Sequence, residues 1–369
     1  MRILHIAEFG RRKSGIGTVV EHLYKEQKLL GHDVRIATTT ENLAYRHLDI
    51  KEVRNPDNLS LILYQWLPDA VMFHSIWCMP YIKMAKILKE RNVPYVVMMH
   101  GANSVENYKK NKFKKWVANT LFFNKFMRDA ATIVYLSREE QENCLSKNVN
   151  PNYAIIPNGC DMVDIDVSAK SPNRPLRIVY LGRLIIHHKG LDYLLDALDI
   201  LKKKNFKEAV FQFYGNENDV DIEVVKDRLK SLEGLASYEG PAYGEKKADV
   251  LANADVFILT SRYEGMPMGV LEALAYGVPS ILTPGTNMAE IVMAAGAGWE
   301  TGLNAQAIAD TIIRATIDFN SDYLKYCRSA YLMSKLFDWK IIAERTIELL
   351  QSIAEKPRKS KILRNITNS

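Results

Sequence analysis

Two glutamates in one short segment are the first residues of this chain whose types and spacing suggest chemistry. Glu264 opens the segment Glu264-Gly265-Met266-Pro267-Met268-Gly269, and Glu272 follows after seven intervening residues. Pro267 and the glycines exclude an ordinary helix there, so the segment should present backbone N–H groups toward an anion or a sugar. Glu272 would lie one turn into the next helix and point to the same pocket, where two carboxylates can clamp sugar hydroxyls. The alternative is a helix-capping Glu264 and a solvated Glu272.

Two cations accompany another strand-to-helix turn. Gly182-Arg183-Leu184 directly follows a buried run, and Lys189-Gly190 comes shortly after. Arg183 and Lys189 would supply two fixed positive charges, which suits a diphosphate leaving group. The alternative is a pair of surface cations on a loop. His187 and His188 lie between them, are expected to face solvent, and receive no role.

The first half of the chain carries weaker signals. Ser14-Gly15-Ile16-Gly17-Thr18 opens a helix, and its glycines would let N–H groups approach an anion. It lacks the third glycine of a dinucleotide motif, so a tight turn that binds no ligand is the alternative.

His100-Gly101 follows a buried run, where a histidine can donate to a sugar hydroxyl or a developing charge; a core or capping histidine is the alternative. Pro157-Asn158-Gly159 predicts only a turn.

These residues depend on elements that alternate along the chain. Strands are expected over 2–7, 34–38, 70–73, 95–99, 132–136, 176–181, 210–214, 256–260 and 280–282. Helices are expected over 18–30, 81–91, 138–146, 190–203, 220–233, 269–275 and 305–318. The polar stretch 161–175 is typical of a linker. The pattern predicts an α/β protein of two doubly wound domains, whose strand ends face a cleft that holds the active site.

Composition narrows the class of protein. The chain has 369 residues, 47% of them hydrophobic, which predicts packed cores, and no apolar run reaches 18 residues. Glu8 interrupts any signal-peptide core. The four cysteines are widely spaced and form no metal or redox motif, which predicts a protein of the reducing cytoplasm.

Charge is distributed unevenly. Residues 1–160 hold 23 Lys+Arg against 15 Asp+Glu, residues 161–355 hold 21 against 28, and residues 356–369 add five cations.

The stretch 107–128 interleaves lysines at 109, 110, 112, 114, 115 and 125 with aromatic residues at 108, 113, 116, 122, 123 and 126. On a helix this pattern favours an anionic membrane surface, the alternative being aromatics in the core and solvated lysines. Nucleic acid is disfavoured, because no binding module accompanies the stretch and the acidic second half would repel it.

The order and spacing of the motifs resemble the retaining nucleotide-sugar glycosyltransferases of family 4, which have the GT-B architecture. The resemblance runs from residue 1 to about 355. It is carried by SGIG at 14–17, MHG at 99–101, IPNGCD at 156–161, GRL and KG within 182–190, ADVFILTSRYEGMPMGVLEALAYGVPSIL at 254–282 and FDW at 337–339.

The resemblance implies two Rossmann-like domains that face a cleft. Residues 1–165 would form the acceptor side, completed by about 340–369 through a C-terminal helix that crosses back, and residues 172–339 would bind the nucleotide sugar. The backbone at Gly15 and Gly17 would meet the distal phosphate, and Gly182, Arg183 and Lys189 would surround the diphosphate.

The same resemblance implies roles for the remaining residues. His100 and Glu264 would contact the donor sugar, and the backbone of Gly265, Met266, Pro267 and Met268 would hold sugar and phosphate. Glu272 would take the ribose, and the loop 240–244, with Pro241, the base. One departure is Tyr214-Gly215-Asn216-Glu217, where the family often has Gly-x-Gly, so the part played by this turn stays open.

The resemblance implies front-face transfer of a hexose-type sugar with retention, without a metal. A UDP-sugar is the favoured donor and GDP-mannose a possible one. The acceptor would be a saccharide or a polyprenyl-diphosphate-linked saccharide, at the inner face of the membrane, in polysaccharide synthesis. The alternatives are a GT-B sugar-nucleotide epimerase or hydrolase, and a non-catalytic nucleotide-sugar-binding protein. A dehydrogenase is disfavoured, because neither domain has the full dinucleotide pattern.

Overall fold

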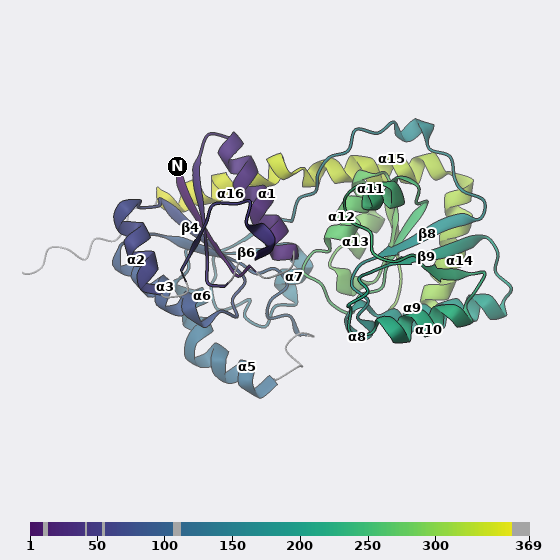
Figure 1. Cartoon of the computed structure of the whole chain (residues 1–369), viewed down its shortest axis with the longest axis horizontal. Helices are drawn as coiled ribbons and strands as arrows, with labels where there is room; N and C mark the ends of the chain where they lie inside the picture. Colours follow the sequence, from purple (N-terminus) through teal and green to yellow (C-terminus); the bar gives the residue numbers. More distant parts are fainter. Residues whose placement is uncertain (10–13, 41–42, 54–55, 106–111, 356–369) are drawn as a thin grey trace, which may run out of the picture.

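The computed structural model describes residues 1–9, 14–40, 43–53, 56–105 and 112–355, arranged as two lobes that each surround one parallel sheet (Figure 1). The first sheet has seven strands in the order β3-β2-β1-β4-β5-β6-β7. Their bounds are β1 Arg2–Ala7, β2 Asp33–Thr38, β3 Ile50–Glu52, β4 Ala70–His74, β5 Tyr95–Met98, β6 Thr132–Tyr135 and β7 Tyr153–Ile155. The order reverses between β1 and β4, which is where doubly wound folds bind ligands.

The second sheet has six strands in the order β10-β9-β8-β11-β12-β13, again all parallel. Their bounds are β8 Leu176–Leu181, β9 Ala209–Tyr214, β10 Ala236–Tyr238, β11 Val256–Leu259, β12 Ser280–Leu282 and β13 Gly298–Glu300. The fold class predicted from the alternating pattern, α/β with two doubly wound lobes, is confirmed.

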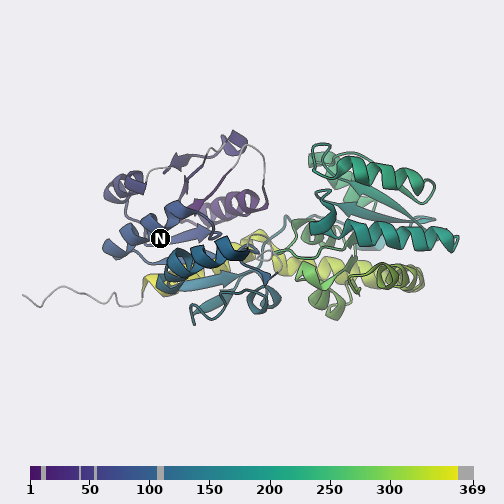
Figure 2. The same cartoon turned by 90° about the horizontal axis from the view of Figure 1, so that it is seen from below.

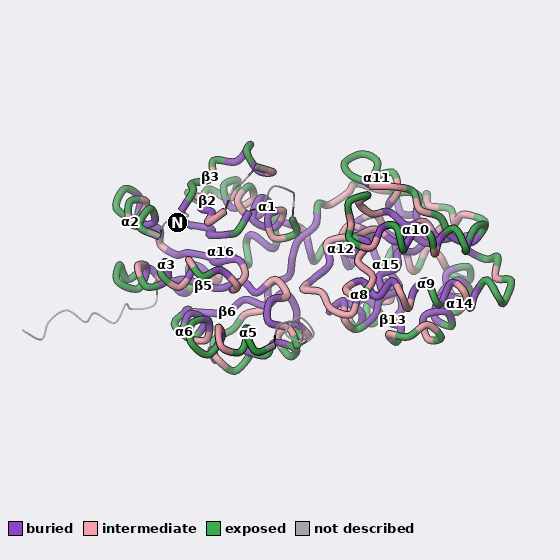
Figure 3. The backbone as a smooth tube through the Cα atoms, turned by 60° about the horizontal axis from the view of Figure 1, so that its bottom comes forward, coloured by how far each residue is buried: buried purple, intermediate pink, exposed green. Residues whose placement is uncertain are grey.

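Helices cover both sheets. Those of the first lobe are α1 Gly15–Leu29, α2 Pro56–Gln65, α3 Met79–Glu90, α5 Lys112–Ala118, α6 Asn124–Asp129 and α7 Arg138–Glu142. Those that follow are α8 Ile186–Lys189, α9 Leu191–Lys203, α10 Ile222–Ser231, α11 Gly244–Ala252, α12 Met268–Ala275, α13 Ala289–Ala294, α14 Ala305–Ser321, α15 Tyr323–Ser334 and α16 Trp339–Ala354. Since the helices shield the sheets, strands such as β5 and β6 are buried along their whole length (Figure 3).

The last helix returns to the first lobe. α15 lies on the second lobe and α16 crosses to pack against α1 and β4 (Figures 1 and 2). Trp339 anchors its start, because its ring stacks on His22 of α1 at 4.8 Å and fills the space where a Cβ on Gly159 would lie. The two lobes are thereby joined at both the linker and the C-terminal helix.

Several element bounds differ from those expected. α1 begins at Gly15 rather than Thr18, because Ser14 caps it by accepting a hydrogen bond from the amide of Gly17. The helix expected over 190–203 is present as α9, which starts one residue later at Leu191. It is preceded by the short helix α8, which was not predicted and which Gly190, with a left-handed φ of 62°, separates from α9. α7 stops at Glu142, four residues short of the prediction.

Candidate active site

Glu264 lies in the loop after β11 and pairs with a lysine from the neighbouring strand-to-helix turn. Lys189 Nζ is 2.5 Å from Glu264 Oε1, and the hydroxyl of Ser261 donates to the same oxygen at 2.7 Å. The two charged side chains are only 10% and 11% exposed. The carboxylate expected to clamp a sugar and a cation expected to face a diphosphate therefore meet in one nearly buried ion pair.

The backbone around Lys189 is held against the end of β11. Thr260 donates its hydroxyl to the carbonyl of Lys189 at 3.1 Å. A Cβ on Gly190 would overlap the carbonyl oxygen of Thr260, so only glycine allows this approach. Arg262 donates to both carboxylate oxygens of Asp192, at 2.8 and 2.6 Å, and fastens α9 to the same loop.

The ion pair keeps Glu264 charged. Burial alone would raise the pKa of Glu264, but the adjacent positive charge of Lys189 lowers it below its ordinary value overall. His188 belongs to the same cluster: its ring stacks on Tyr263 and its Nε2 donates to the Tyr263 carbonyl at 2.8 Å. The expectation that His188 faces solvent is wrong, because this stacking buries it, and burial lowers its pKa.

The segment after Glu264 ends in an uncapped helix N-terminus. α12 starts at Met268 after Pro267, which offers no side-chain cap, and Met266 is buried. Asn287 donates its side-chain amide to the carbonyls of Glu264 and Gly265, at 2.7 and 3.1 Å, which fixes the orientation of these peptides. In the described part of the chain the amides of Met268 and Gly269 have no acceptor, as a site for an anion requires.

Arg183 lies beside this cluster with its side chain exposed. Gly182 continues from β8, and the Tyr180 hydroxyl donates to the carbonyl of Arg183 at 2.7 Å. The positive charge of Arg183 contributes to lowering the pKa of His188, after burial and Lys189. The guanidinium has no acceptor among the described residues. Arg183 is thus the cation of the predicted pair that is free to meet a ligand.

The turn that departs from the family pattern has its own anchor. Asp219 accepts from the amides of Leu184 and Asn216, at 2.7 and 3.1 Å, and Asp221 accepts from Ile186 at 2.7 Å. Gly215 is required there, because a Cβ would overlap Leu184. Carboxylates therefore occupy the amide of Asn216 in this turn and the amides of Leu184 and Ile186 in the turn after β8.

Glu272 lies one turn into α12 and is ion-paired. Its Oε1 is 2.7 Å from Nζ of Lys247 on α11, and the two side chains are 24% and 33% exposed. Pro241 lies half-buried in the loop before α11, where Gly240 has a φ of 81°. Lys247 was not predicted from the sequence, although Glu272 on the next helix could have prompted a search for a basic partner.

The first lobe meets the Glu264 loop directly. A Cβ on Gly101 would lie 2.8 Å from the amide nitrogen of Gly265, and one on Gly265 would lie 2.9 Å from the amide nitrogen of Gly101. Asn158 donates to the carbonyl of Met266 at 3.2 Å. His100 precedes this contact with a φ of 52° and is half-buried. The structure thus brings His100 beside the Glu264 loop, although they are far apart in the sequence.

Gly15 and Gly17 have different surroundings at the start of α1. A Cβ on Gly17 would overlap the ring of Tyr45, so packing requires this glycine. A Cβ on Gly15 would meet nothing within 4 Å. Space around Gly15 leaves it free to approach a ligand, whereas Gly17 is explained by the fold.

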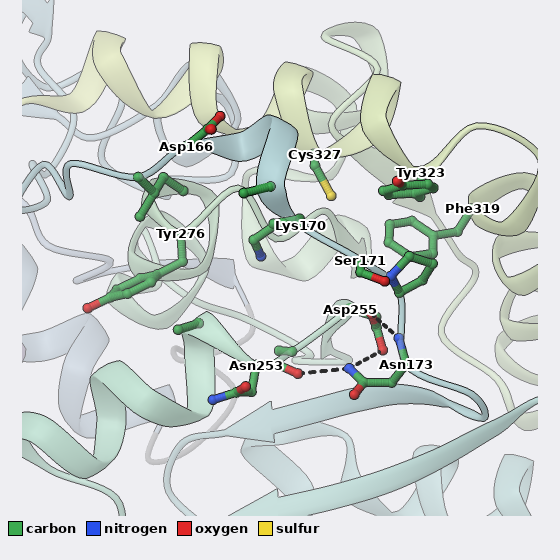
Figure 4. Close-up of a pocket in the computed structure, with 15 residues that line it drawn as sticks. Asp166, Lys170, Ser171, Asn173, Asn253, Asp255, Tyr276, Phe319, Tyr323 and Cys327 are labelled. Atoms are coloured by element: carbon green, nitrogen blue, oxygen red, sulfur yellow. Dashed lines mark hydrogen bonds between the residues drawn. The ribbon is translucent and has the colours of Figure 1, made fainter.

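A cavity of about 430 Å³ lies elsewhere in the second lobe, between the linker and α15 (Figure 4). Asp255, at the start of β11, accepts from the side chain of Asn173 there, and Lys170 and Cys327 also line the cavity. It lies at the amino ends of the strands, opposite Glu264. Because Arg183, Lys189 and Glu264 lie at the carboxyl ends of the strands, where doubly wound folds bind ligands, this cavity is not the candidate active site.

The basic aromatic stretch divides between core and surface. Phe123 and Phe126 are buried, whereas Phe113 and Trp116 on α5 are 74% and 57% exposed. Leu121 and Phe122 are also exposed, on a π-helical turn over Asn119–Phe123. Residues 108–110, the side chain of Lys112 and the basic tail 356–369 lie outside the described residues.

Two absences hold for the described residues. No helix there is long and apolar enough to cross a bilayer. No group of three or more His, Cys, Asp or Glu residues in the same ranges is arranged to hold a metal ion.

Comparison with known proteins places this geometry in a family. Residues 14–159 match the model described as "Glycosyl transferase 4-like domain", and residues 175–318 match "Glycosyl transferases group 1". Mannosylfructose-phosphate synthase of Agrobacterium fabrum is 34% identical over 29% of this chain and 25% of its own length. A capsular polysaccharide biosynthesis glycosyltransferase, CapH of Staphylococcus aureus, is 25% identical over 63% and 64%.

The chain spans less than two thirds of the length of these curated relatives. The crystal structure of Anabaena HepE in complex with UDP-glucose shares the fold, with a TM-score of 0.72, 17% identity, and 95% and 100% of the two chains covered. The two family models cover most of the chain in the order of the two lobes. The chain therefore belongs to the GT-B glycosyltransferases of the group 1 and 4-like family.

Proposed function

We propose that this chain transfers a hexose-type sugar from a nucleotide diphosphate sugar to a saccharide or lipid-linked acceptor, with retention of anomeric configuration. The observation that carries the proposal is the Glu264 loop. It combines a charged carboxylate paired with Lys189, an uncapped helix N-terminus at Met268 and the exposed guanidinium of Arg183. A sugar needs hydrogen-bond acceptors and a diphosphate needs cations and amides, and these are supplied side by side.

Glu264 acts as an orienting group. Its lowered pKa keeps it an acceptor near neutral pH, so it receives hydrogen bonds from donor-sugar hydroxyls. The amides at Met268 and Gly269 and the charge of Arg183 stabilise the negative charge that grows on the diphosphate as the sugar–phosphate bond breaks. Lys189 acts through Glu264 in this scheme, and its positive charge also contributes to the field on the leaving group.

Retention follows from attack on the same face. The bond from the anomeric carbon to the phosphate oxygen breaks heterolytically toward an oxocarbenium-like state. The acceptor hydroxyl then attacks from the side of the leaving diphosphate and gives its proton to a diphosphate oxygen. No metal takes part in the proposed scheme.

The nucleoside would lie over α11 and α12. The Glu272 carboxylate accepts from the ribose hydroxyls, while Lys247 holds that carboxylate in place at 2.7 Å. The loop containing Pro241 would contact the base. A UDP-sugar is favoured, because the structurally similar HepE was crystallised in complex with UDP-glucose, and GDP-mannose is the second candidate.

The proposed setting is polysaccharide synthesis at the cytoplasmic face of a membrane. The similarity to CapH, a glycosyltransferase of capsular polysaccharide biosynthesis, supports the pathway class. Exposed Phe113 and Trp116 on α5, next to exposed Lys114, fit an anionic lipid surface, where each cation contributes about 1 kcal/mol. A polyprenyl-diphosphate-linked saccharide is the favoured acceptor.

The transfer reaction is tested with a panel of UDP-hexoses and GDP-mannose and a polyprenyl-diphosphate-linked saccharide. We expect mass spectrometry to detect a glycosylated acceptor, and NMR of the product to show the anomeric configuration of the donor. A free sugar or an epimerised nucleotide sugar without acceptor product would favour the epimerase or hydrolase alternative. An inverted product would contradict retention.

Membrane binding is tested separately by flotation with anionic liposomes. We expect Lys114→Glu combined with Lys125→Glu to reduce flotation, while Lys203→Glu combined with Lys230→Glu on the second lobe changes the net charge equally and leaves binding intact. Equal loss in both double variants, or no binding by the wild type, would refute a specific membrane face.

A further inference from the structure

Three histidines form a line through the first lobe and end at the candidate active site. His5 on β1, His74 at the end of β4 and His100 after β5 come from three adjacent strands. His5 Nδ1 lies 2.9 Å from His74 Nε2, and His74 Nδ1 lies 2.9 Å from His100 Nε2. Successive rings are stacked with centroids 5.2 Å apart. Such a continuous chain requires each ring to donate from one nitrogen and accept at the other.

The rings are neutral near pH 7. His5 and His74 are at most 1% exposed. Burial lowers the pKa of His5 to about 4, with a partly opposing contribution from its hydrogen bond to Gln27, and lowers that of His100 to about 3. The pKa of His74 lies well below its ordinary value for the same reason, helped by the flanking rings. A neutral imidazole carries one N–H, so the chain has only two consistent proton arrangements.

The hydrogen bond between His5 and Gln27, at the end of the line away from the candidate site, selects one of the two proton arrangements. Gln27 of α1 is fully buried, and its Oε1 lies 2.8 Å from His5 Nε2. Because a carbonyl oxygen only accepts, the proton of His5 sits on Nε2, and its Nδ1 accepts from His74 Nε2. By the same step His74 Nδ1 accepts from His100 Nε2. The remaining nitrogen of His100, Nδ1, is then left without a proton.

We infer that Gln27, His5 and His74 are positioning residues that hold His100 in the Nε2–H tautomer, so that His100 Nδ1 accepts a hydrogen bond from a donor-sugar hydroxyl. The assignment of the sugar as ligand rests on the proposed function, whereas the tautomer does not. The inference alters the role expected for His100, which becomes an acceptor from the sugar rather than a donor to it. It also explains two buried histidines that transfer itself does not use.

The opposite arrangement would follow from a rotated Gln27 amide. Its nitrogen would then donate to His5 Nε2, every ring would reverse, and His100 would carry its proton on Nδ1. The Nε2 of Gln27 has no hydrogen-bond partner in the described part of the chain. The two arrangements therefore differ in the nitrogen that carries hydrogen on each of the three rings, and the difference at His100 is the one that reaches the candidate site.

The test is a two-bond ¹H–¹⁵N correlation spectrum of the histidine-labelled full chain, with His100→Asn used to identify the His100 signals. We expect the Nε2–H pattern for His100 in the wild type. We expect Gln27→Met, which removes the acceptor at similar volume, to yield a mixture of tautomers, and Gln306→Met on the exposed face of α14 to leave the spectrum unchanged.

Two results would overturn the inference: an Nδ1–H pattern for His100 in the wild type, or an unchanged pattern in Gln27→Met. The wild-type spectrum decides even if the variant fails to fold, and neither spectrum needs a nucleotide sugar. Where a nucleotide sugar binds, Gln27→Met should weaken it about two- to tenfold, the value of one neutral hydrogen bond. Unchanged affinity would refute the link between the line of histidines and the donor.

Discussion

Removing Lys189 tests whether Glu264 depends on its ion pair. Lys189→Met keeps the length of the side chain but leaves a carboxylate that is only 11% exposed without its counter-charge. The hydroxyl of Ser261, at 2.7 Å from Glu264, would remain as a neutral partner. The variant therefore measures how strongly the fold relies on charge at the centre of the candidate site.

The magnitude follows from the geometry. At 2.5 Å and an effective dielectric constant of about 20, the gross attraction is roughly 7 kcal/mol, most of which offsets desolvation. Leaving one buried partner unpaired costs about 3–5 kcal/mol. For a lobe of this size each kcal/mol shifts Tm by about 2–4 °C, so we expect a loss of roughly 6–20 °C. The double variant Lys189→Met with Glu264→Gln should recover much of the loss, because no charge is left unpaired.

The assay is thermal unfolding of Lys189→Met, of Glu264→Gln and of the double variant, with Lys125→Met as a control. Lys125 pairs with Asp129 at 3.3 Å but is 74% exposed, so its loss should cost less than about 1 kcal/mol. A Lys189→Met variant no less stable than Lys125→Met, or a double variant less stable than either single one, would refute the buried ion pair.

Three further predictions concern the first lobe. Gly101→Ala should impair folding or donor turnover more than Gly31→Ala, because both positions have positive φ but only Gly101 touches the other lobe; equal effects would count against that contact. Glu140→Gln should lower the free energy of unfolding in urea by about 1–3 kcal/mol, because Glu140 accepts from the amides of Gly101 and Leu136 and an –NH₂ group cannot replace both acceptors; a neutral substitution would contradict this. The pKa of His5 is lowered by burial to about 4 from 6.5, so its contribution to stability is present above pH 6.5 and is lost as pH falls toward 4, by up to about 3 kcal/mol. Urea unfolding across that range should be less pH-dependent in His5→Asn, and an identical slope would show that His5 is not responsible.

The sequence predicted which charged residues lie together at the candidate site, but it did not predict which of them form an ion pair. Arg183, Lys189 and Glu264 each follow a strand, and the carboxyl ends of neighbouring parallel strands share one edge, so their proximity was predictable. That Lys189 faces Glu264 rather than a diphosphate depends on Gly190 and Thr260, whose contact involves residues far apart in the chain.

Other features were beyond local pattern. The strands β3, β10 and β13 were not predicted, because each contains polar or partly exposed residues and none is part of a buried apolar run of the kind that identified the equally short β12. Burial of His188 depends on stacking against Tyr263, and the need for glycine at position 17 depends on Tyr45. In the stretch around α5, alternation could not distinguish buried Phe123 from exposed Phe122, because a π-helical turn changes the direction of successive side chains.

The most direct test of the account is nucleotide-sugar binding at the Glu264 loop. Thermal-shift titration with UDP-hexoses and GDP-mannose should stabilise the wild type, with a shift that grows with ligand concentration. Arg183→Ala should weaken that stabilisation, whereas Arg174→Ala, an exposed arginine at the amino end of the same lobe, should leave it intact. No stabilisation by any nucleotide sugar, or the same stabilisation of Arg183→Ala and the wild type, would contradict the account.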